Sequence, residues 1–397
     1  MIEKTLAELT LNITDGKHGD CRGKDDSGFY FISCKDVRDG QIHYEDARQI
    51  IEEDFWDTHK RTRLEPDDIL VTNSGTIGRM AFIRDVPLTY RTTFQKSVAI
   101  VKPDKSKILP KYLYYQLQNC VDGFVNQSNG AAQKNLLLST MRAFKMHIHE
   151  DEDMQMRIAS TLSAYDDLIE NNQKQIKLLE EAAQRLYKEW FVDLRFPDHE
   201  TTPIVDGIPE GWATSTVGGI CDLKKETVTA NKIDSEIPYI GLEHMPRVDF
   251  CLSNWGMAED VTSNKFKYSE DDIIFGKIRP YFHKVGFALN SGVVSTDSFV
   301  MVAKQGLWGL LLMTVFDKAF VDYTYQTCKE GAKMPRADWK QMEKYPVLIP
   351  EESVLNRFED YIWTVTRRIK ALALQNHALT EARDRLLPKL MSGEIEV

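Results

Sequence analysis

Two long stretches of the chain repeat mostly hydrophobic side chains, interrupted by Asn172, Asn376 and Arg383, at alternating steps of four and three residues. In the first stretch these positions are Ile158, Leu162, Tyr165, Ile169, Asn172, Ile176, Leu179, Ala183, Leu186 and Trp190. In the second stretch they are Phe358, Ile362, Val365, Ile369, Leu372, Asn376, Leu379, Arg383, Leu386 and Leu390. A mean period of about 3.5 residues is typical of a left-handed coiled coil. The pattern predicts one long helix within residues 151–196 and another within 351–397.

The two stretches also match one another, residue by residue, at an offset of 200. Identical pairs in this alignment are Arg157/Arg357, Ile169/Ile369, Gln175/Gln375, Leu179/Leu379, Glu181/Glu381, Ala182/Ala382, Arg185/Arg385 and Leu186/Leu386. The regions before the helices repeat as well, since DDIL at 67–70 is matched by DDII at 271–274. Internal repetition on this scale indicates two copies of one module.

Hydrophobic runs separated by Gly, Pro and Asp turns predict strands in the parts of the chain that precede the helices. Between the copies lies a polar segment, PDHETTPIVDGIPE, which contains three prolines and is typical of a linker. The fold class predicted is α+β, with two similar mixed α/β domains joined by two long helices. The predicted segments are a domain at 1–150, a helix at 151–196, a linker at 197–210, a second domain at 211–350 and a helix at 351–397.

The two helices are predicted to pack as an antiparallel coiled coil with pseudo-two-fold symmetry. In that register Asn172 faces Asn376, and a buried Asn pair can fix register at a cost in stability. The alternative is that each asparagine simply points to water. Pro388 predicts a bend or an end of the second helix near Leu387, because proline disrupts a helix interior. The central seam residues are Ile169, Asn172, Ile176, Ile369, Leu372 and Asn376.

Composition narrows the class of protein. The chain has 397 residues, 42% of them hydrophobic, and a formal net charge of −10. Its six cysteines form no C-x-x-C pair, and the N-terminal residues MIEKTLAELT lack the apolar stretch of a signal peptide. No apolar run is long enough to span a membrane, so a cytoplasmic protein is expected. Residues 151–189 carry nine acidic and five basic side chains. That stretch is either a solvated helix face or a surface that docks a protein partner.

Sequence signatures of catalysis are missing. The chain has no H-E-x-x-H, no G-x-S-x-G and no G-x-G-x-x-G motif. The segment HGDCRGKD at 18–25 lacks the first glycine and the final Ser or Thr of a phosphate-binding loop. We therefore predict no catalytic residue and no metal ligand, and a binding role for the chain.

Each predicted domain has loops in which basic, hydroxyl and amide side chains gather. Lys and Arg neutralise phosphates or contact guanine, whereas Asn and Gln suit adenine. For any single residue an ordinary polar loop is the alternative, but the clusters recur at equivalent positions. In the first domain the candidate DNA contacts are Lys17, Arg22, Lys24, Asn73, Ser74, Thr76, Arg79, Arg91, Thr93, Gln95, Lys96 and Lys134. In the second they are Lys277, Arg279, Tyr281, His283, Lys284, Thr296, Lys333 and Arg336.

Three segments give the chain a family resemblance. They are DDILVTNSGTIGRMAFI at 67–83, DDIIFGKIRPYFHKVGFA at 271–288 and GAAQKNLLLSTMRAFKMHIHEDEDMQMRIASTLSAYDDLIENN at 130–172. With them the chain resembles the specificity (S) subunit of type I restriction–modification enzymes over essentially its whole length. The second copy departs from the first, with Arg336 and Asp338 where the first has Asn135 and Leu137.

The resemblance implies two target-recognition domains that each read half of a split double-stranded DNA sequence, with the helix pair as spacer. It implies two modification subunits that bind S-adenosylmethionine and methylate adenine, and restriction subunits that use ATP and Mg²⁺. This chain would itself hold no cofactor, and the system would defend a bacterial or archaeal cytoplasm against foreign DNA. A structural adaptor whose two heads bind proteins, and an enzyme with an unrecognised site in one head, are the competing hypotheses.

Overall fold

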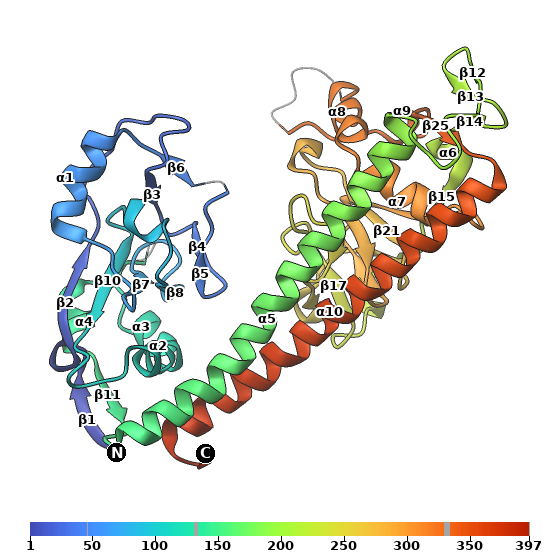
Figure 1. Ribbon diagram of the computed structural model, residues 1–397. Coiled ribbons are helices and arrows are strands. Elements are labelled where there is room, and N and C mark those ends of the chain that lie inside the picture. Colours follow the sequence, from blue (N-terminus) through green and yellow to red (C-terminus); the bar gives the residue numbers. More distant parts are fainter. Residues whose placement is uncertain (46, 131–133, 329–333, 397) are drawn as a thin grey trace. The chain divides into compact units, whose positions relative to one another are not determined.

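The computed structural model describes residues 1–45, 47–130, 134–328 and 334–396. The chain divides into two compact units, one made of Met1–Asp167 with Thr380–Val397 and the other of Leu168–Leu379. Each unit contains β-sheets, short helices and a portion of both long helices (Figure 1).

The first unit is built on a four-stranded antiparallel sheet in the order β2-β10-β7-β8. Its strands are β1 (Ile2–Thr5), β2 (Thr10–Asp15), β3 (Tyr30–Ile32), β4 (Val37–Arg38), β5 (Gln41–Ile42), β6 (Arg48–Gln49), β7 (Ile69–Thr72), β8 (Met80–Phe82), β9 (Thr92–Phe94), β10 (Val98–Pro103) and β11 (Lys145–Ile148). Its short helices are α1 (Glu52–Thr62), α2 (Pro110–Asn119), α3 (Val121–Asn126) and α4 (Leu138–Ala143). Outside the sheet, β1 pairs with β11, and β3 runs parallel to β9.

The second unit repeats this topology. Its strands are β12 (Ile204–Val205), β13 (Ile208–Pro209), β14 (Ala213–Thr216), β15 (Cys221–Leu223), β16 (Thr227–Val228), β17 (Pro238–Ile240), β18 (Cys251–Leu252), β19 (Gly256–Met257), β20 (Lys265–Tyr268), β21 (Ile273–Gly276), β22 (Val285–Ala288), β23 (Gly292–Val294), β24 (Ser298–Ala303) and β25 (Pro346–Ile349). Its short helices are α6 (Val217–Ile220), α7 (Trp308–Phe316), α8 (Lys318–Gln326) and α9 (Trp339–Met342). The order β15-β24-β21-β22, the β14-β25 pair and the parallel β17-β23 pair correspond to the arrangement in the first unit.

One inner strand of the main sheet of each unit is buried on both faces. In β7, Ile69 and Val71 pack in a core with Tyr112 of α2, whereas Leu70 packs on the other face with Phe94 of β9. Successive side chains of a strand point to opposite faces, so a strand covered on both sides needs an unbroken apolar run. The same division holds in the second unit, where β21 places residues 273 and 275 in one core and 274 in another.

The two long helices are in contact. They are α5 (Glu152–Tyr187), which continues as a π-helical turn over Lys188–Val192, and α10 (Glu352–Ser392). Within the second unit, Asn172 contacts Asn376 while Tyr187 lies against Phe358, so the helices run antiparallel. The predicted fold class, two mixed α/β domains joined by a long antiparallel helix pair, is confirmed. The predicted segment boundaries stay a prediction.

Of the bend or end of the second helix expected near Leu387, the end is contradicted by the structure. The helix continues to Ser392, and Gly393 stops it with a φ of 75°. Leu390 is fully buried and Met391 nearly so, both in the core of the first unit. Burial of this last turn offsets the loss of the hydrogen bond that a proline removes.

The predicted linker also has local structure, because β12 and β13 form a hairpin around Asp206 and Gly207, both with positive φ.

Candidate nucleic-acid interface

In the first unit, three loops are tied together by backbone hydrogen bonds just beyond β7. The Asn73 N–H donates to the Ser97 carbonyl at 3.1 Å, and the Leu136 N–H donates to the Asn73 carbonyl at 2.8 Å. Ser74 and Asn135 form a β-bridge. We call this arrangement of loops 73–79, 95–97 and 134–136 the three-loop frame of the first unit. It brings together candidates that lie more than 60 residues apart in the sequence.

The second unit has the same frame. The Lys277 N–H donates to the Asp297 carbonyl at 2.7 Å, and the Ala337 N–H donates to the Lys277 carbonyl at 2.8 Å. Ile278 forms a β-bridge with Arg336. Asn73, Ser97 and Asn135 of the first frame therefore correspond to Lys277, Asp297 and Arg336 of the second, whose loops are 277–284, 295–297 and 335–337.

Most of the candidates in the first frame lie at the surface. Thr76, Arg79, Lys96 and Lys134 are exposed, and Ser74 and Gln95 are half-buried. Asn73 is buried at 5% exposure, and its Oδ1 accepts no hydrogen bond from any described residue. Thr93 was wrongly predicted as a DNA contact. It is fully buried in β9, where its hydroxyl lies 3.4 Å from that of Thr62, because its strand position turns it toward α1.

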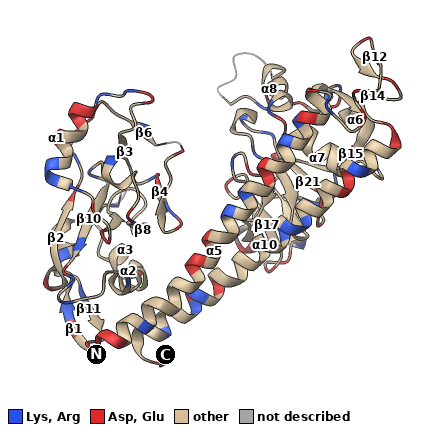
Figure 2. Ribbon diagram, viewed as in Figure 1, with Lys and Arg blue, Asp and Glu red and all other residues tan. Residues whose placement is uncertain are grey.

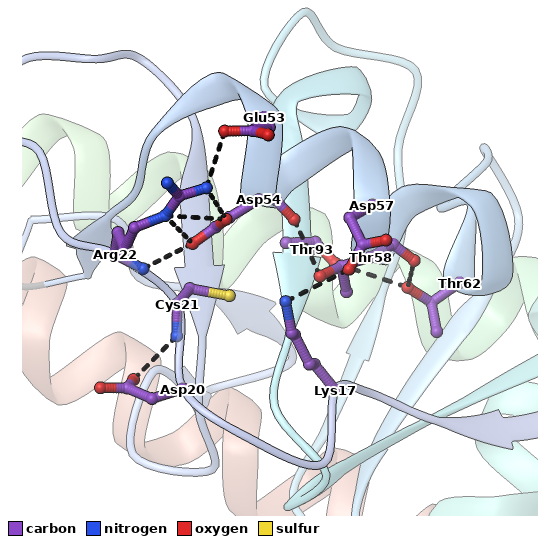
Figure 3. A network of polar contacts seen from close by, with 10 residues as sticks. All are labelled: Lys17, Asp20, Cys21, Arg22, Glu53, Asp54, Asp57, Thr58, Thr62 and Thr93. Atoms are coloured by element: carbon purple, nitrogen blue, oxygen red, sulfur yellow. Dashed lines mark hydrogen bonds and ion pairs between the residues drawn. The ribbon is translucent and has the colours of Figure 1, made fainter.

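The basic candidates near the N-terminus are held by acids of α1 (Figure 3). The Arg22 guanidinium lies 2.7 Å from both Glu53 and Asp54. Hydrogen bonds from the side chain and the backbone N–H of Arg22 lower the pKa of the Asp54 carboxyl to about 2. Lys17 lies 3.3 Å from Asp57. The prediction that Arg22 and Lys17 face DNA did not account for these partners, which lie some 30 to 40 residues away in sequence.

The remaining basic candidates of the first unit are less constrained. Lys24 is exposed, and no side-chain partner is described for it. Arg91 is also exposed, with its guanidinium carbon 5.9 Å from the ring centre of Phe29. Both remain available for an anionic ligand.

In the second frame a lysine and an arginine crowd together. The Lys277 ammonium donates to the Thr296 carbonyl at 2.6 Å and lies 4.4 Å from the ring centre of Phe299. Burial, together with the nearby Arg336 charge, lowers the pKa of Lys277 to about 8. Arg336 forms an ion pair with Asp297 and remains 56% exposed. Thr296 is exposed beside them.

The loop around residues 279–284 is only partly available. His283 contacts the Phe316 carbonyl through Nε2 at 2.7 Å, and burial lowers its pKa, while Lys284 donates to the Leu242 carbonyl. Both side chains are turned toward protein carbonyls, so their prediction as DNA contacts is not supported by their positions. Tyr281 is exposed. Arg279 has a left-handed backbone with φ of 52°, and its buried Nε has no hydrogen-bond partner among the described residues. The candidate Lys333 lies outside the described residues.

Comparison with known proteins decides the family. Residues 22–181 match the model of the type I restriction modification DNA specificity domain. The MjaIX specificity subunit of Methanocaldococcus jannaschii is 26% identical over 350 residues, which cover 83% of this chain and 78% of that protein. The HindI specificity subunit of Haemophilus influenzae is 22% identical over 368 residues, covering 75% of this chain and 80% of that protein. The chain belongs to the family of type I restriction–modification specificity subunits.

The fold agrees with this family. The crystal structure of the S subunit from M. genitalium matches with a TM-score of 0.59 at 14% identity, covering 98% of this chain and 96% of that chain. This protein is accordingly a DNA specificity subunit of a type I system, in a family without catalytic activity of its own.

Several residues of the specificity subunit's frames were missed by sequence reasoning. Asn135 and Asp297 are placed there by the backbone bonds described above, and Lys225 and Arg247 lie nearby, with Arg247 4.0 Å from the ring centre of Phe282. Asn135 could have been found in advance, because it aligns with Arg336 in the internal repeat. Lys225 and Arg247 carry no local signal, since only the tertiary fold brings them to the site.

Several acidic residues of α5 are paired with basic side chains or buried. Both charge signs occur along the two long helices (Figure 2). Glu170 pairs with Lys174 at 2.7 Å, Asp166 pairs with Arg383 at 2.7 Å, and Glu180 is buried.

Within the described parts of the chain, no cluster of three His, Cys, Asp or Glu side chains could hold a metal ion. The helices of those parts are also too short or too polar to cross a membrane.

Proposed function

We propose that this specificity subunit reads a two-part double-stranded DNA target, with the three-loop frame of each unit facing the major groove of one half. The observation that carries the proposal is the backbone equivalence of the two frames, which nevertheless hold different side chains. One frame contains Asn73, Ser97 and Asn135, and the other contains Lys277, Asp297 and Arg336 at the equivalent backbone positions. A constant scaffold with variable polar side chains suits recognition of two different base sequences.

We further propose that the antiparallel helix pair sets the gap between the two half-sites and docks two modification subunits. Those partners would bind S-adenosylmethionine and methylate adenine at N6. Restriction subunits, where the system includes them, would add ATP- and Mg²⁺-dependent cleavage of foreign DNA. The complex would act in the cytoplasm of a bacterium or archaeon. The paired and buried charges of α5 and α10 support a structural role for the helices, and their exposed charges offer a surface for partners.

The competing hypothesis is an adaptor whose heads bind proteins. The salt dependence of binding distinguishes the two functions. Neutralising phosphates releases counterions, so the affinity for DNA falls steeply as the salt concentration is raised. The frames contain exposed cations in both units, namely Arg79, Lys96 and Lys134 in the first and Arg336 in the second. This favours DNA as the ligand of both.

The proposal is tested by purifying the chain with its modification partner and mapping methylated adenines across genomic DNA. We expect methylation only within a motif of two defined half-sites separated by a gap of fixed length. DNA binding by the complex should weaken steeply as salt is raised. Methylation without a sequence motif, or within one uninterrupted motif, would overturn the proposal. The same complex assembled without this chain is the control and should show no motif.

A further inference from the structure

We infer that one equivalent position in the two frames selects a base in each half-site, with Arg336 selecting guanine in one half and Asn135 selecting adenine in the other. The inference rests on the proposed function. It goes further because it assigns a base, and a residue that reads it, to each unit.

The two residues occupy the same place in the fold. Asn135 forms a β-bridge with Ser74, and Arg336 forms one with Ile278. Ser74 directly follows Asn73, and Ile278 directly follows Lys277, the residues whose backbone bonds tie the loops together. The residue following each of them donates its N–H to Asn73 or Lys277 at 2.8 Å. The shared bonds place the main chain of both residues at corresponding positions of the two frames, although Asn135 is also paired with Asn129 by two backbone hydrogen bonds.

Solvent reaches the outer position of each frame, Asn135 or Arg336, whereas the side chain at the inner position, Asn73 or Lys277, is buried or bonded within the protein. Asn135 and Arg336 are both exposed. At the inner position, Asn73 is buried and the Lys277 ammonium is committed to the Thr296 carbonyl. Base edges can be contacted only by side chains that solvent also reaches, so the outer position is the better candidate for direct readout.

Arg336 has the chemistry and the support expected for guanine recognition. A guanidinium offers five N–H donors in a rigid fork, and its two-bond contact with guanine O6 and N7 is the commonest specific contact in the major groove. Asp297 accepts a hydrogen bond from one terminal nitrogen of Arg336, and no other partner for this guanidinium is described. The carboxylate restrains the side chain, which lowers the entropy lost when the remaining donors meet a base.

Asn135 has a different setting. The residue equivalent to Asp297 is Ser97, whose hydroxyl accepts the Cys34 N–H at 3.2 Å and brings no charge. The frame of the first unit thus lacks the carboxylate that would hold an arginine. An exposed side-chain amide can accept from adenine N6 and donate to adenine N7, the pairing that asparagine makes with this base. Neighbouring Lys134 supplies a cation for the phosphate backbone.

The test uses the complete complex after its methylation motif is known. Binding is measured on duplex probes in which each base pair of both half-sites is changed in turn, for wild type and for Arg336→Lys. The substitution keeps the charge but removes the two-bond fork. We expect the preference for guanine at one position of one half-site to fall about 5- to 150-fold, with the salt dependence of binding unchanged. Arg63→Lys, at an exposed arginine that is paired with Glu65 outside both frames and both long helices, is the matched control and should change no preference.

Two further variants complete the test. Asp297→Asn keeps the shape of the positioning residue but removes its charge, and should weaken the same guanine preference by a smaller factor. Asn135→Ala should relax an adenine position in the other half-site. The inference is overturned if Arg336→Lys leaves every base preference intact, or if the position it alters is not a guanine. A complex with no bipartite motif at all would instead contradict the proposed function, so the two failures are distinct.

Discussion

The side-chain amide of Asn172 on α5 donates a 2.9 Å hydrogen bond to the side-chain oxygen of Asn376 on α10. Asn172 is only 4% exposed, and it also lies 3.1 Å from the Gln375 side-chain oxygen. The heptad pattern predicted this pairing from the sequence, against the alternative that each asparagine points to water. A sliding of either helix would leave buried amide groups without partners, which costs about 1–3 kcal/mol for each group. The pair therefore opposes other registers.

Replacing both asparagines by leucine should raise the melting temperature while allowing other registers. Leucine is more stable at a seam position, but it provides no polar partner that penalises sliding. Asn172→Leu alone should be less stable than the double variant, because Asn376 then loses its partner. Thermal unfolding would give the stabilities, and cysteine cross-linking between the helices would give the register. A double variant that melts lower than the single one would contradict this account.

Glu180 makes the stability of the second unit depend on pH. Burial raises the pKa of its carboxyl to about 8, and the nearby Asp249 acts in the same direction, although the Phe250 N–H donates to it at 3.1 Å. Between pH 4.5 and 8 the folded protein holds this proton and the unfolded chain does not. The resulting stabilisation is therefore complete below pH 4.5 and is lost as the pH rises toward 8.

Glu180→Gln should remove this dependence, because the amide stays neutral at every pH. The variant should match wild type near pH 5 and exceed it near pH 8, by at most about 1.4 kcal/mol for each pH unit. Denaturant unfolding across this range provides the measurement. Glu181→Gln, on the exposed neighbour, is the control and should follow wild type. Parallel curves for wild type and Glu180→Gln would show that Glu180 does not titrate in this window.

Glu359 attaches α7 to the second long helix. Its carboxyl oxygens accept the Gly309 N–H at 2.7 Å and the Leu310 N–H at 2.8 Å. Both N–H groups lie in the first turn of α7, where no carbonyl of the helix itself can accept from them. Glu359→Ala should destabilise the protein by roughly 3 kcal/mol, because it leaves both buried donors unpaired. Asp360→Ala, at an exposed position next to it, should cost less than about 0.5 kcal/mol. Equal effects of the two substitutions in denaturant unfolding would refute this role.

Arg79 and Arg279 provide a test of independent heads. Arg79 lies in the frame of the first unit and Arg279 in the frame of the second. Arg79→Ala should weaken binding to one half-site and Arg279→Ala to the other, each by about 1–3 kcal/mol if the side chain contacts a base. Probes carrying one intact and one scrambled half-site separate the two effects. Equal loss at both half-sites for either variant would argue against independent recognition.

The proposed spacer role predicts how the gap responds to helix length. Seven residues inserted between Asn172 and Ile176, with seven more between Leu372 and Asn376, preserve the heptad phase in both helices. The helices then lengthen by about 10 Å, and the preferred gap should grow by about 3 base pairs. Methylation mapping of the folded variant measures the gap. An unchanged gap in a variant with wild-type helicity would exclude the helix pair as the spacer.

The sequence alone determined the elements that depend on local periodicity and on repetition. The heptad spacing specified two long helices and the facing of Asn172 and Asn376, and the duplicated DDIL and DDII runs marked the buried strands β7 and β21. These signals are readable because each residue's neighbours along the chain are also its neighbours in the element. The end of α10 was misjudged, because burial of Leu390 against a distant core outweighs the local effect of Pro388.

Only the tertiary structure decided which polar side chains are free to bind. Arg22 looks available in the sequence, yet Glu53 and Asp54 neutralise it, and Thr93 faces α1 rather than solvent. Conversely, backbone hydrogen bonds that join three separate loops place Asn135 and Asp297 beside the other site residues. Charge pairing and solvent access depend on distances between residues far apart in the chain, and a sequence carries no direct record of those distances.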